Sequence, residues 1–181
     1  MRKVRTEIAT RAEHLWSPND PYLYDVTATL EFGAAKSQGK QEKLQQESQE
    51  IQEKPAKSQE KQDIVRSYCA FRTVEIKPDL KGIARFHLNG KPVFLKGVLD
   101  QGYWPGSLIT APDDEAFKTD IELAKKMGFN GCRKHQKAED PRFLYWADKL
   151  GYIVWGEMAA ACVYNETSVA RTTREWIDIV E

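Results

Sequence analysis

The chain has 181 residues, enough for one domain or two small ones. It carries 27 lysines and arginines against 27 aspartates and glutamates, and this zero net charge argues against a nucleic acid as the main partner. No apolar run approaches the roughly 20 residues that a membrane helix needs, and no apolar stretch of a secretory signal follows Met1. We therefore expect a cytoplasmic rather than a secreted protein that binds neither nucleic acid nor membrane.

The first part of the chain has the pattern of β-strands. Residues Tyr22–Leu30, Ile64–Tyr68 and Phe71–Ile76 are rich in aromatic and β-branched side chains. Three or four strands are too few for a complete β-sandwich. We therefore expect residues 1–80 to form part of such a sandwich.

The composition changes abruptly between residues 34 and 62. This segment consists mainly of Lys, Gln, Glu and Ser, with only Leu44 and Ile51 as large apolar residues. Such a segment cannot bury a core, so we expect a disordered surface insert that can be deleted with little effect on the fold. An alternative is that the insert binds a partner, which would make the chain an interaction protein.

The part of the chain after residue 81 alternates between strand and helix patterns. Asn89-Gly90 is typical of a tight hairpin turn, and we expect a buried strand Val93–Val98 to follow it. Two further short strands are expected within 128–135 and at Tyr152–Trp155, each followed by polar side chains. This order predicts a parallel sheet that belongs to a (β/α) barrel.

Helix signals lie between these expected strands. Asp113 and the acidic residues after it begin a helix that ends near Met127, with Gly128 as its cap. Asp140-Pro141 begins a second helix that ends at Gly151. A third is expected over about 171–180. Residues 81–181 would then be the first three βα units of an (β/α)8 TIM barrel, an incomplete barrel.

Three cysteines, Cys69, Cys132 and Cys162, are widely spaced and form no CxxC motif. We expect free, buried thiols, no metal site and no cofactor.

Several motifs, in order along the chain, resemble glycoside hydrolase family 2, which includes β-galactosidases, β-glucuronidases and β-mannosidases. Together they cover nearly all of the chain outside 34–62: Trp16-Ser17-Pro18 with Pro21-Tyr22-Leu23-Tyr24, Phe71-Arg72-Thr73, Leu88-Asn89-Gly90-Lys91-Pro92, Leu95-Lys96-Gly97-Val98, Gly128-Phe129-Asn130, Arg133-Lys134-His135, Asp140-Pro141-Arg142, Trp146-Ala147-Asp148 and Val154-Trp155-Gly156-Glu157.

The resemblance implies that the chain is a fragment of a retaining glycoside hydrolase that acts on O-glycosidic bonds of β-glycosides. It further implies that residues 1–80 are the end of an immunoglobulin-like sandwich and that residues 81–181 begin the catalytic barrel. Retaining enzymes need two carboxyl groups about 5–5.5 Å apart. The family's acid/base and nucleophile are expected beyond residue 181, because Glu166 precedes the third helix and is expected in a loop. The chain would therefore contain no catalytic residue and be inactive alone.

Five residues at the expected strand ends are candidates for contact with a carbohydrate. The resemblance implies sugar binding by Arg133 and His135, and Glu157 could bind hydroxyls or orient the arginine. Tyr103 and Trp104 could stack on a pyranose ring. An ion pair at the barrel mouth is the structural alternative for Arg133 and Glu157.

Two further expectations concern the second part of the chain. We expect Arg133, His135 and Glu157 at one end of an open three-stranded parallel sheet, and Trp146 and Trp155 in the core. A second class of function stays open, a carbohydrate-binding remnant without chemistry.

Overall fold

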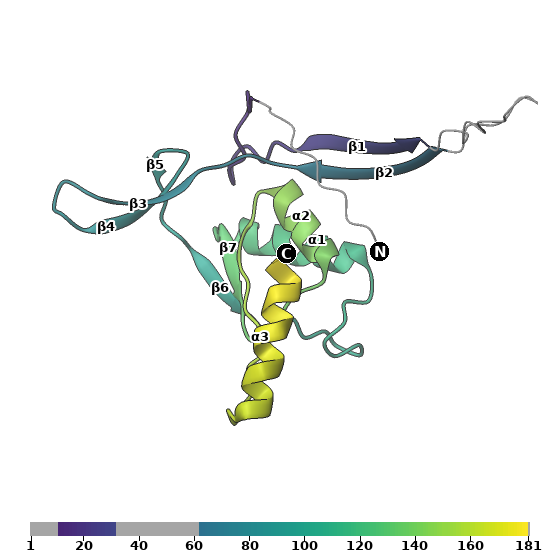
Figure 1. The fold of residues 1–181 in the computed structure, drawn as a ribbon. Coiled ribbons are helices and arrows are strands. Elements are labelled where there is room, and N and C mark those ends of the chain that lie inside the picture. Colours follow the sequence, from purple (N-terminus) through teal and green to yellow (C-terminus); the bar gives the residue numbers. More distant parts are fainter. Residues whose placement is uncertain (1–10, 32–61, 181) are drawn as a thin grey trace, which may run out of the picture. The chain divides into compact units, whose positions relative to one another are not determined.

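The computed structural model describes residues 11–31 and 62–180 of the chain (Figure 1). By its internal contacts the chain divides into one unit of Met1–Tyr24 with Ala70–Glu181 and a second unit of Asp25–Cys69. The segment 34–62, expected to be a disordered insert, lies outside the described residues except for Gln62, which begins a strand.

The described elements follow the order β1 to β5, β6-α1-β7-α2-β8 and α3 (Figure 1). Their bounds are β1 Tyr24–Glu31, β2 Gln62–Cys69, β3 Val74–Pro78, β4 Ala84–Leu88, β5 Lys91–Pro92, β6 Gly97–Asp100, α1 Asp114–Lys126, β7 Gly131–Lys134, α2 Pro141–Leu150, β8 Ile153–Trp155 and α3 Glu166–Val180.

In the smaller unit, β1 and β2 pair as a two-stranded sheet. The larger unit holds two three-stranded sheets, β3-β4-β5 and β6-β7-β8. In the first, β4 pairs antiparallel with both of its neighbours, and Asn89 and Gly90 make the expected turn between β4 and β5, both with positive φ.

The second sheet is parallel throughout, with β7 between β6 and β8. The α/β pattern of the second half of the chain is therefore confirmed as three parallel strands with helices between them.

Caps determine where the first two helices begin and end. Asp113 accepts a hydrogen bond from the N–H of Ala116 at 2.8 Å, and Asp140 accepts one from Arg142 at the start of α2. Gly151 closes α2 with φ of 72°, in the left-handed region where glycine carries little strain. Both helices have the expected bounds, because their caps are local signals.

The two helices pack against one another and bury the core of the larger unit. Its side chains come from α1, α2, β7 and the residues beside them: Ala111, Phe117, Ile121, Ala124, Cys132, Phe143, Ala147 and Tyr152. Phe117 meets Phe143 edge to face, with ring centroids 5.8 Å apart. Cys132 is buried as expected, but Cys162 is exposed, because the stretch before α3 leaves it outside the core.

The strand expected at Val93–Val98 exists as β6, but its bounds are wrong, because β6 spans Gly97–Asp100. Val93 continues the hairpin through a bond from its N–H to Phe86 O, and the parallel strand begins only at Gly97. Between them, the Asn130 side chain donates to Phe94 O at 2.9 Å and accepts from Lys96 N at 2.8 Å. These bonds replace a strand ladder, and Phe94 is 78% exposed instead of buried.

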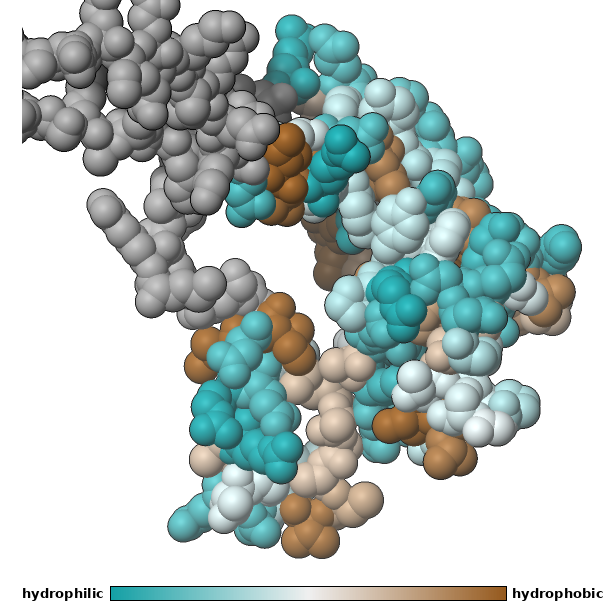
Figure 2. Space-filling view, turned by 90° about the vertical axis from the view of Figure 1, so that its right-hand side faces the viewer, coloured by the Kyte–Doolittle hydropathy of each residue, from teal (hydrophilic) through white to brown (hydrophobic). Residues whose placement is uncertain are grey.

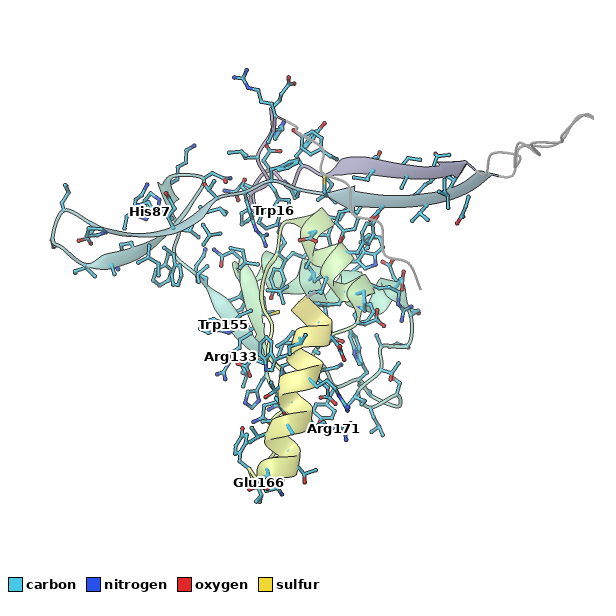
Figure 3. All side chains as sticks on the ribbon, viewed as in Figure 1. Trp16, His87, Arg133, Trp155, Glu166 and Arg171 are labelled. Carbon is cyan, nitrogen blue, oxygen red and sulfur yellow. The ribbon has the colours of Figure 1, made fainter. Side chains whose placement is uncertain are left out.

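The third helix begins five residues before its expected start. Asn165 Oδ1 accepts from Ser168 N while Ser168 Oγ accepts from Asn165 N, both at 2.9 Å, a reciprocal cap. Glu166, expected in a loop, is therefore the first residue of α3, as its label in Figure 3 shows. Among the described helices, none has the length and apolar character to cross a membrane.

Candidate functional site

The two faces of the parallel sheet differ in character. Val98, Cys132 and Val154 lie in register and pack in or against the core beneath α1 and α2. Successive strand residues point to opposite faces, so the row Leu99, Arg133 and Trp155 lies on the other face. Trp155 is 61% exposed, which corrects its expected core position, whereas Trp146 does pack against the core.

Arg133 and Glu157 form an ion pair at the carboxyl ends of β7 and β8. Arg133 Nε donates to Glu157 Oε1, and Glu157 Oε2 accepts from the backbone N–H of Gln136 at 3.0 Å. The bond from Arg133, followed by that from Gln136, lowers the pKa of the Glu157 carboxyl. Figure 3 labels Arg133 beside Trp155, its neighbour in register.

His135 lies at the same end of the sheet. Its backbone N–H donates to Asp100 O at 2.8 Å, which continues the pairing of β6 with β7 by one residue. Gln101 Nε2 contacts His135 Nδ1 at 3.2 Å. With the amide as donor, the neutral imidazole holds its proton on Nε2. The structure thus brings together Arg133, His135 and Glu157, as expected.

A hollow of about 580 Å³ opens beside these strand ends. The residues after β6, β7 and β8 line it together with the last turns of α3; they include Gln101, Tyr103, His135, Lys137, Met158 and Asp178. Its mixed polar and apolar lining suits a small hydroxylated ligand.

The two aromatic candidates differ in position. Tyr103 is 68% exposed and lines the hollow. Trp104 instead packs against the core and meets Phe117 edge to face, with ring centroids 5.9 Å apart. Only the tyrosine therefore presents an open ring in this structure.

A buried charged cluster behind the hollow was missed by the sequence interpretation. Lys134 is 1% exposed, and its Nζ lies 2.7 Å from Asp100 Oδ2 and 2.8 Å from Glu139 Oε2. Lys137 Nζ lies 3.1 Å from Glu139 Oε1. We call these four residues the lysine–carboxylate cluster. The signal in the sequence was the position of Lys134, which shares the core-facing parity of Cys132.

Opposing effects set the charge states within this cluster. Burial alone would lower the pKa of Lys134, but hydrogen bonds to Asp100 and Glu139 outweigh it and raise the pKa above its usual value. Burial would likewise raise the pKa of Glu139, but bonds from Lys134, the Asp140 N–H and Lys137 lower it. The raised pKa of Lys134 and the lowered pKa of Glu139 both favour the charged forms of these two groups at neutral pH.

The described residues contain no group of three or more His, Cys, Asp or Glu side chains that could hold a metal ion.

No protein-family model matches the chain. It is 32% identical over 120 residues to a Formosa agariphila protein named "Putative beta-glucuronidase", an alignment covering 65% of this chain and 14% of that protein. It is 27% identical over 155 residues to the β-galactosidase of Vibrio cholerae, covering 86% of this chain and 12% of that enzyme. The chain thus spans about a seventh of the length of these curated relatives.

Two solved structures have a similar fold over most of this chain. The β-glucuronidase of Parabacteroides merdae superimposes with a TM-score of 0.64 at 21% identity, covering 89% of this chain and 16% of that one. A Bacteroides uniformis β-glucuronidase superimposes with a TM-score of 0.62 at 27% identity, covering 84% and 15%.

Proposed function

We propose that this chain, which is similar to glycoside hydrolase family 2 over most of its length, is part of a retaining enzyme that hydrolyses β-glycosides. The relatives named above are a β-glucuronidase and a β-galactosidase, both of which act on O-glycosyl bonds. In this proposal residues 81–181 are the first three βα units of a TIM barrel, and residues 1–80 belong to an immunoglobulin-like sandwich.

The observation that carries the proposal is the meeting of polar side chains at the carboxyl ends of the parallel strands. Active sites of (β/α)8 barrels lie at this face. Here Gln101 and His135 line a hollow of about 580 Å³. The Arg133–Glu157 pair lies outside that lining and is joined to it by the bond from the backbone N–H of Gln136, a lining residue, to Glu157. This arrangement supports a sugar-binding role for the chain.

Each candidate residue has a role in the proposed complex. A guanidinium has five N–H donors, and the bond to Glu157 uses the one on Nε, so Arg133 retains donors for sugar hydroxyls. His135 would hydrogen-bond a hydroxyl, while Tyr103 would lie against a pyranose face. Trp104 would join it only after leaving its present contact with Phe117.

Glu157 is better suited to orient Arg133 than to act as a general acid. A general acid must hold a proton near neutral pH, whereas the lowered pKa of Glu157 favours its ionised form. Glu166 begins α3 and is exposed. We therefore propose that the acid/base and the nucleophile come from outside residues 1–181.

A binding and turnover experiment tests this function. We expect isotope-labelled chain to show amide shifts at 133–138 with methyl β-galactoside, β-glucuronide or β-mannoside, and no hydrolysis of the chromogenic forms. Arg133→Ala should weaken binding about tenfold or more, since a charge-assisted hydrogen bond is lost.

Arg85→Ala is the matched control. Arg85 is also half-exposed and pairs through Nε with one carboxylate, Asp79, at 3.1 Å in the hairpin. Equal loss in both variants, or no binding of any glycoside, would refute sugar recognition at the hollow. Turnover that disappears in Glu157→Gln would refute the assignment of catalysis to residues outside the chain.

A further inference from the structure

We propose that Lys134 is a positioning residue for the hollow: its buried ammonium joins the loop after β6 to the loop after β7 and thereby fixes Gln101 and His135. The inference rests on the proposed function for its sugar-binding consequence. Its structural part, the placement of the imidazole, is independent of that function.

The ammonium is bound from both loops. Asp100 ends β6, Lys134 ends β7, and Glu139 lies in the segment between β7 and α2. Lys134 Nζ bridges the two carboxylates at 2.7 and 2.8 Å and lies 4.0 Å from the centre of the Phe143 ring. It is thus enclosed by ionic and aromatic partners.

Glu139 extends the link to the rest of the first loop. Its other oxygen pairs with Lys137, whose Nζ also donates to Gly102 O at 3.0 Å and to Ile109 O at 2.7 Å. Gly102 has φ of 65°, and a Cβ there would lie 2.7 Å from both Glu139 Oε2 and Lys137 Nζ. The loop therefore lies against the cluster, and a larger residue at position 102 would displace the ends of these two side chains.

The cluster is adjacent to the hollow along both loops. Gln101 follows Asp100 and His135 follows Lys134, so these two lining residues of the hollow are each one peptide bond from a cluster residue. Asp100 also accepts from Gly102 N at 2.7 Å through its side chain and from His135 N at 2.8 Å through its carbonyl. A shift of Lys134 would be transmitted to the Gln101–His135 contact by these bonds.

A purely stabilising role is the alternative. Replacing a whole buried ion network by neutral groups is often without cost in stability, whereas removing one partner leaves an uncompensated charge. Geometry and stability can therefore be separated by comparing a single with a charge-balanced double variant.

The imidazole signals of the labelled chain provide the readout, since the chain has only 3 histidines. We expect Lys134→Met to move the long-range proton–nitrogen signals of His135 but not those of His14 and His87. Lys125→Met is the matched control. Lys125 is another partly buried lysine, but it binds Pro18 O and Gly151 O, near the ends of α1 and α2.

The double variant Lys134→Met, Glu139→Gln removes the link but keeps the cluster neutral overall. We expect it to regain stability relative to the single variant and still to show displaced His135 signals. If the single variant does not fold, the double variant alone tests whether Lys134 positions His135. His135 signals unchanged in the folded double variant, or moved as far by Lys125→Met, would overturn the positioning role.

Sugar affinity gives the second readout. With methyl β-galactoside as the probe, we expect the double variant to bind about tenfold more weakly and Lys125→Met to bind within about twofold of the parent chain. Undiminished affinity in the double variant would overturn the positioning role. Absence of binding by the parent chain to every glycoside would refute the proposed function, while the imidazole signals would still decide the role of Lys134.

Discussion

Two lysines at opposite ends of the parallel strands are shielded from water in different ways. At the carboxyl ends, the Lys134 ammonium lies between the carboxylates of Asp100 and Glu139. At the amino ends, the Lys125 ammonium is bound by backbone carbonyls, of Leu150, Gly151 at 3.2 Å and Pro18 at 3.4 Å. The Lys134 ammonium is thus compensated by charged carboxylates, whereas the Lys125 ammonium is solvated by the dipoles of peptide carbonyls.

The difference shows in the preferred protonation state. Paired carboxylates raise the pKa of Lys134 against the effect of its burial. Burial is what lowers the pKa of Lys125. The first region is therefore a charged network that links loops, and the second is a helix C-terminus capped by a lysine side chain.

Removing the two ammonium groups is the strongest test of this comparison. Lys134→Met leaves two facing carboxylates with less compensation, and we expect a loss of about 3–5 kcal/mol in the free energy of unfolding. Lys125→Met loses bonds to carbonyls that water can partly replace, and about 1–2 kcal/mol is expected. Denaturant titration measures both. Equal losses would remove the distinction between the two regions.

Substitution of Gly151 tests how tightly the chain packs where backbone carbonyls bind Lys125. Gly151→Ala places a Cβ 2.4 Å from Pro18 O, at φ of 72°, and should cost about 2–3 kcal/mol, because left-handed strain adds to a backbone clash. Gly82→Ala has a similar φ of 77° but open space around it, so about 1–2 kcal/mol is expected. Indistinguishable thermal shifts would mean that the Pro18 contact is loose.

At alkaline pH, Lys134 and Lys125 should change the stability of the folded state in opposite directions. Lys134 has a raised pKa, so its contribution to stability is complete below the unfolded value of 10.5 and is lost as pH rises through its folded value. Lys125 has a lowered pKa, so the folded state gains stability as pH rises toward 10.5.

Unfolding measured across the alkaline range checks these signs. Lys125→Met should abolish the gain below 10.5, and Lys134→Met should flatten the loss above it. The same pH dependence in both variants would contradict the opposite protonation preferences.

The smallest expected effect is on a thiol. Burial raises the pKa of Cys132 to about 12, so alkylation at neutral pH should spare it and modify the exposed Cys162. Because Lys134→Met is expected to cost more stability than Lys125→Met, it should open the core more often and speed the modification of Cys132 severalfold more. Mass spectrometry of the peptides gives both rates, and fast labelling of Cys132 in the parent chain would show an open core.

Local signals explain what the sequence predicted. The bounds of α1 and α2 follow from Asp113, Asp140-Pro141 and Gly151, each of which acts within one helical turn. The start of α3 was missed although Asn165 and Ser168 have the spacing of a reciprocal cap. The meeting of Arg133, His135 and Glu157 at one end of the sheet could be predicted because strand ends in parallel sheets share one edge, whereas sugar binding by these residues was implied by the family resemblance and stays a prediction.

Long-range partners explain the errors. Phe94 looks like part of a buried strand, but the side chain of Asn130, far along the chain, binds the backbone there. Trp155 looks like a core residue, but its parity in β8 places it opposite the helices. Lys134 looks like a surface charge until Asp100 and Glu139 are seen beside it. Figure 2 shows apolar and polar side chains interspersed on one face, a distribution that composition alone does not give.

The position of Trp16 has a consequence for folding kinetics. Its indole N–H donates to Asp148 O at 2.7 Å across 132 residues of sequence, and its backbone N–H donates to Phe71 O at 2.8 Å. Closing so long a loop is costly in entropy, so this contact should form after α2 and the parallel sheet and be absent from the transition state. Contacts of that kind govern how fast a protein opens. Trp16, buried at 1% exposure, would then slow unfolding and leave the folding rate unchanged.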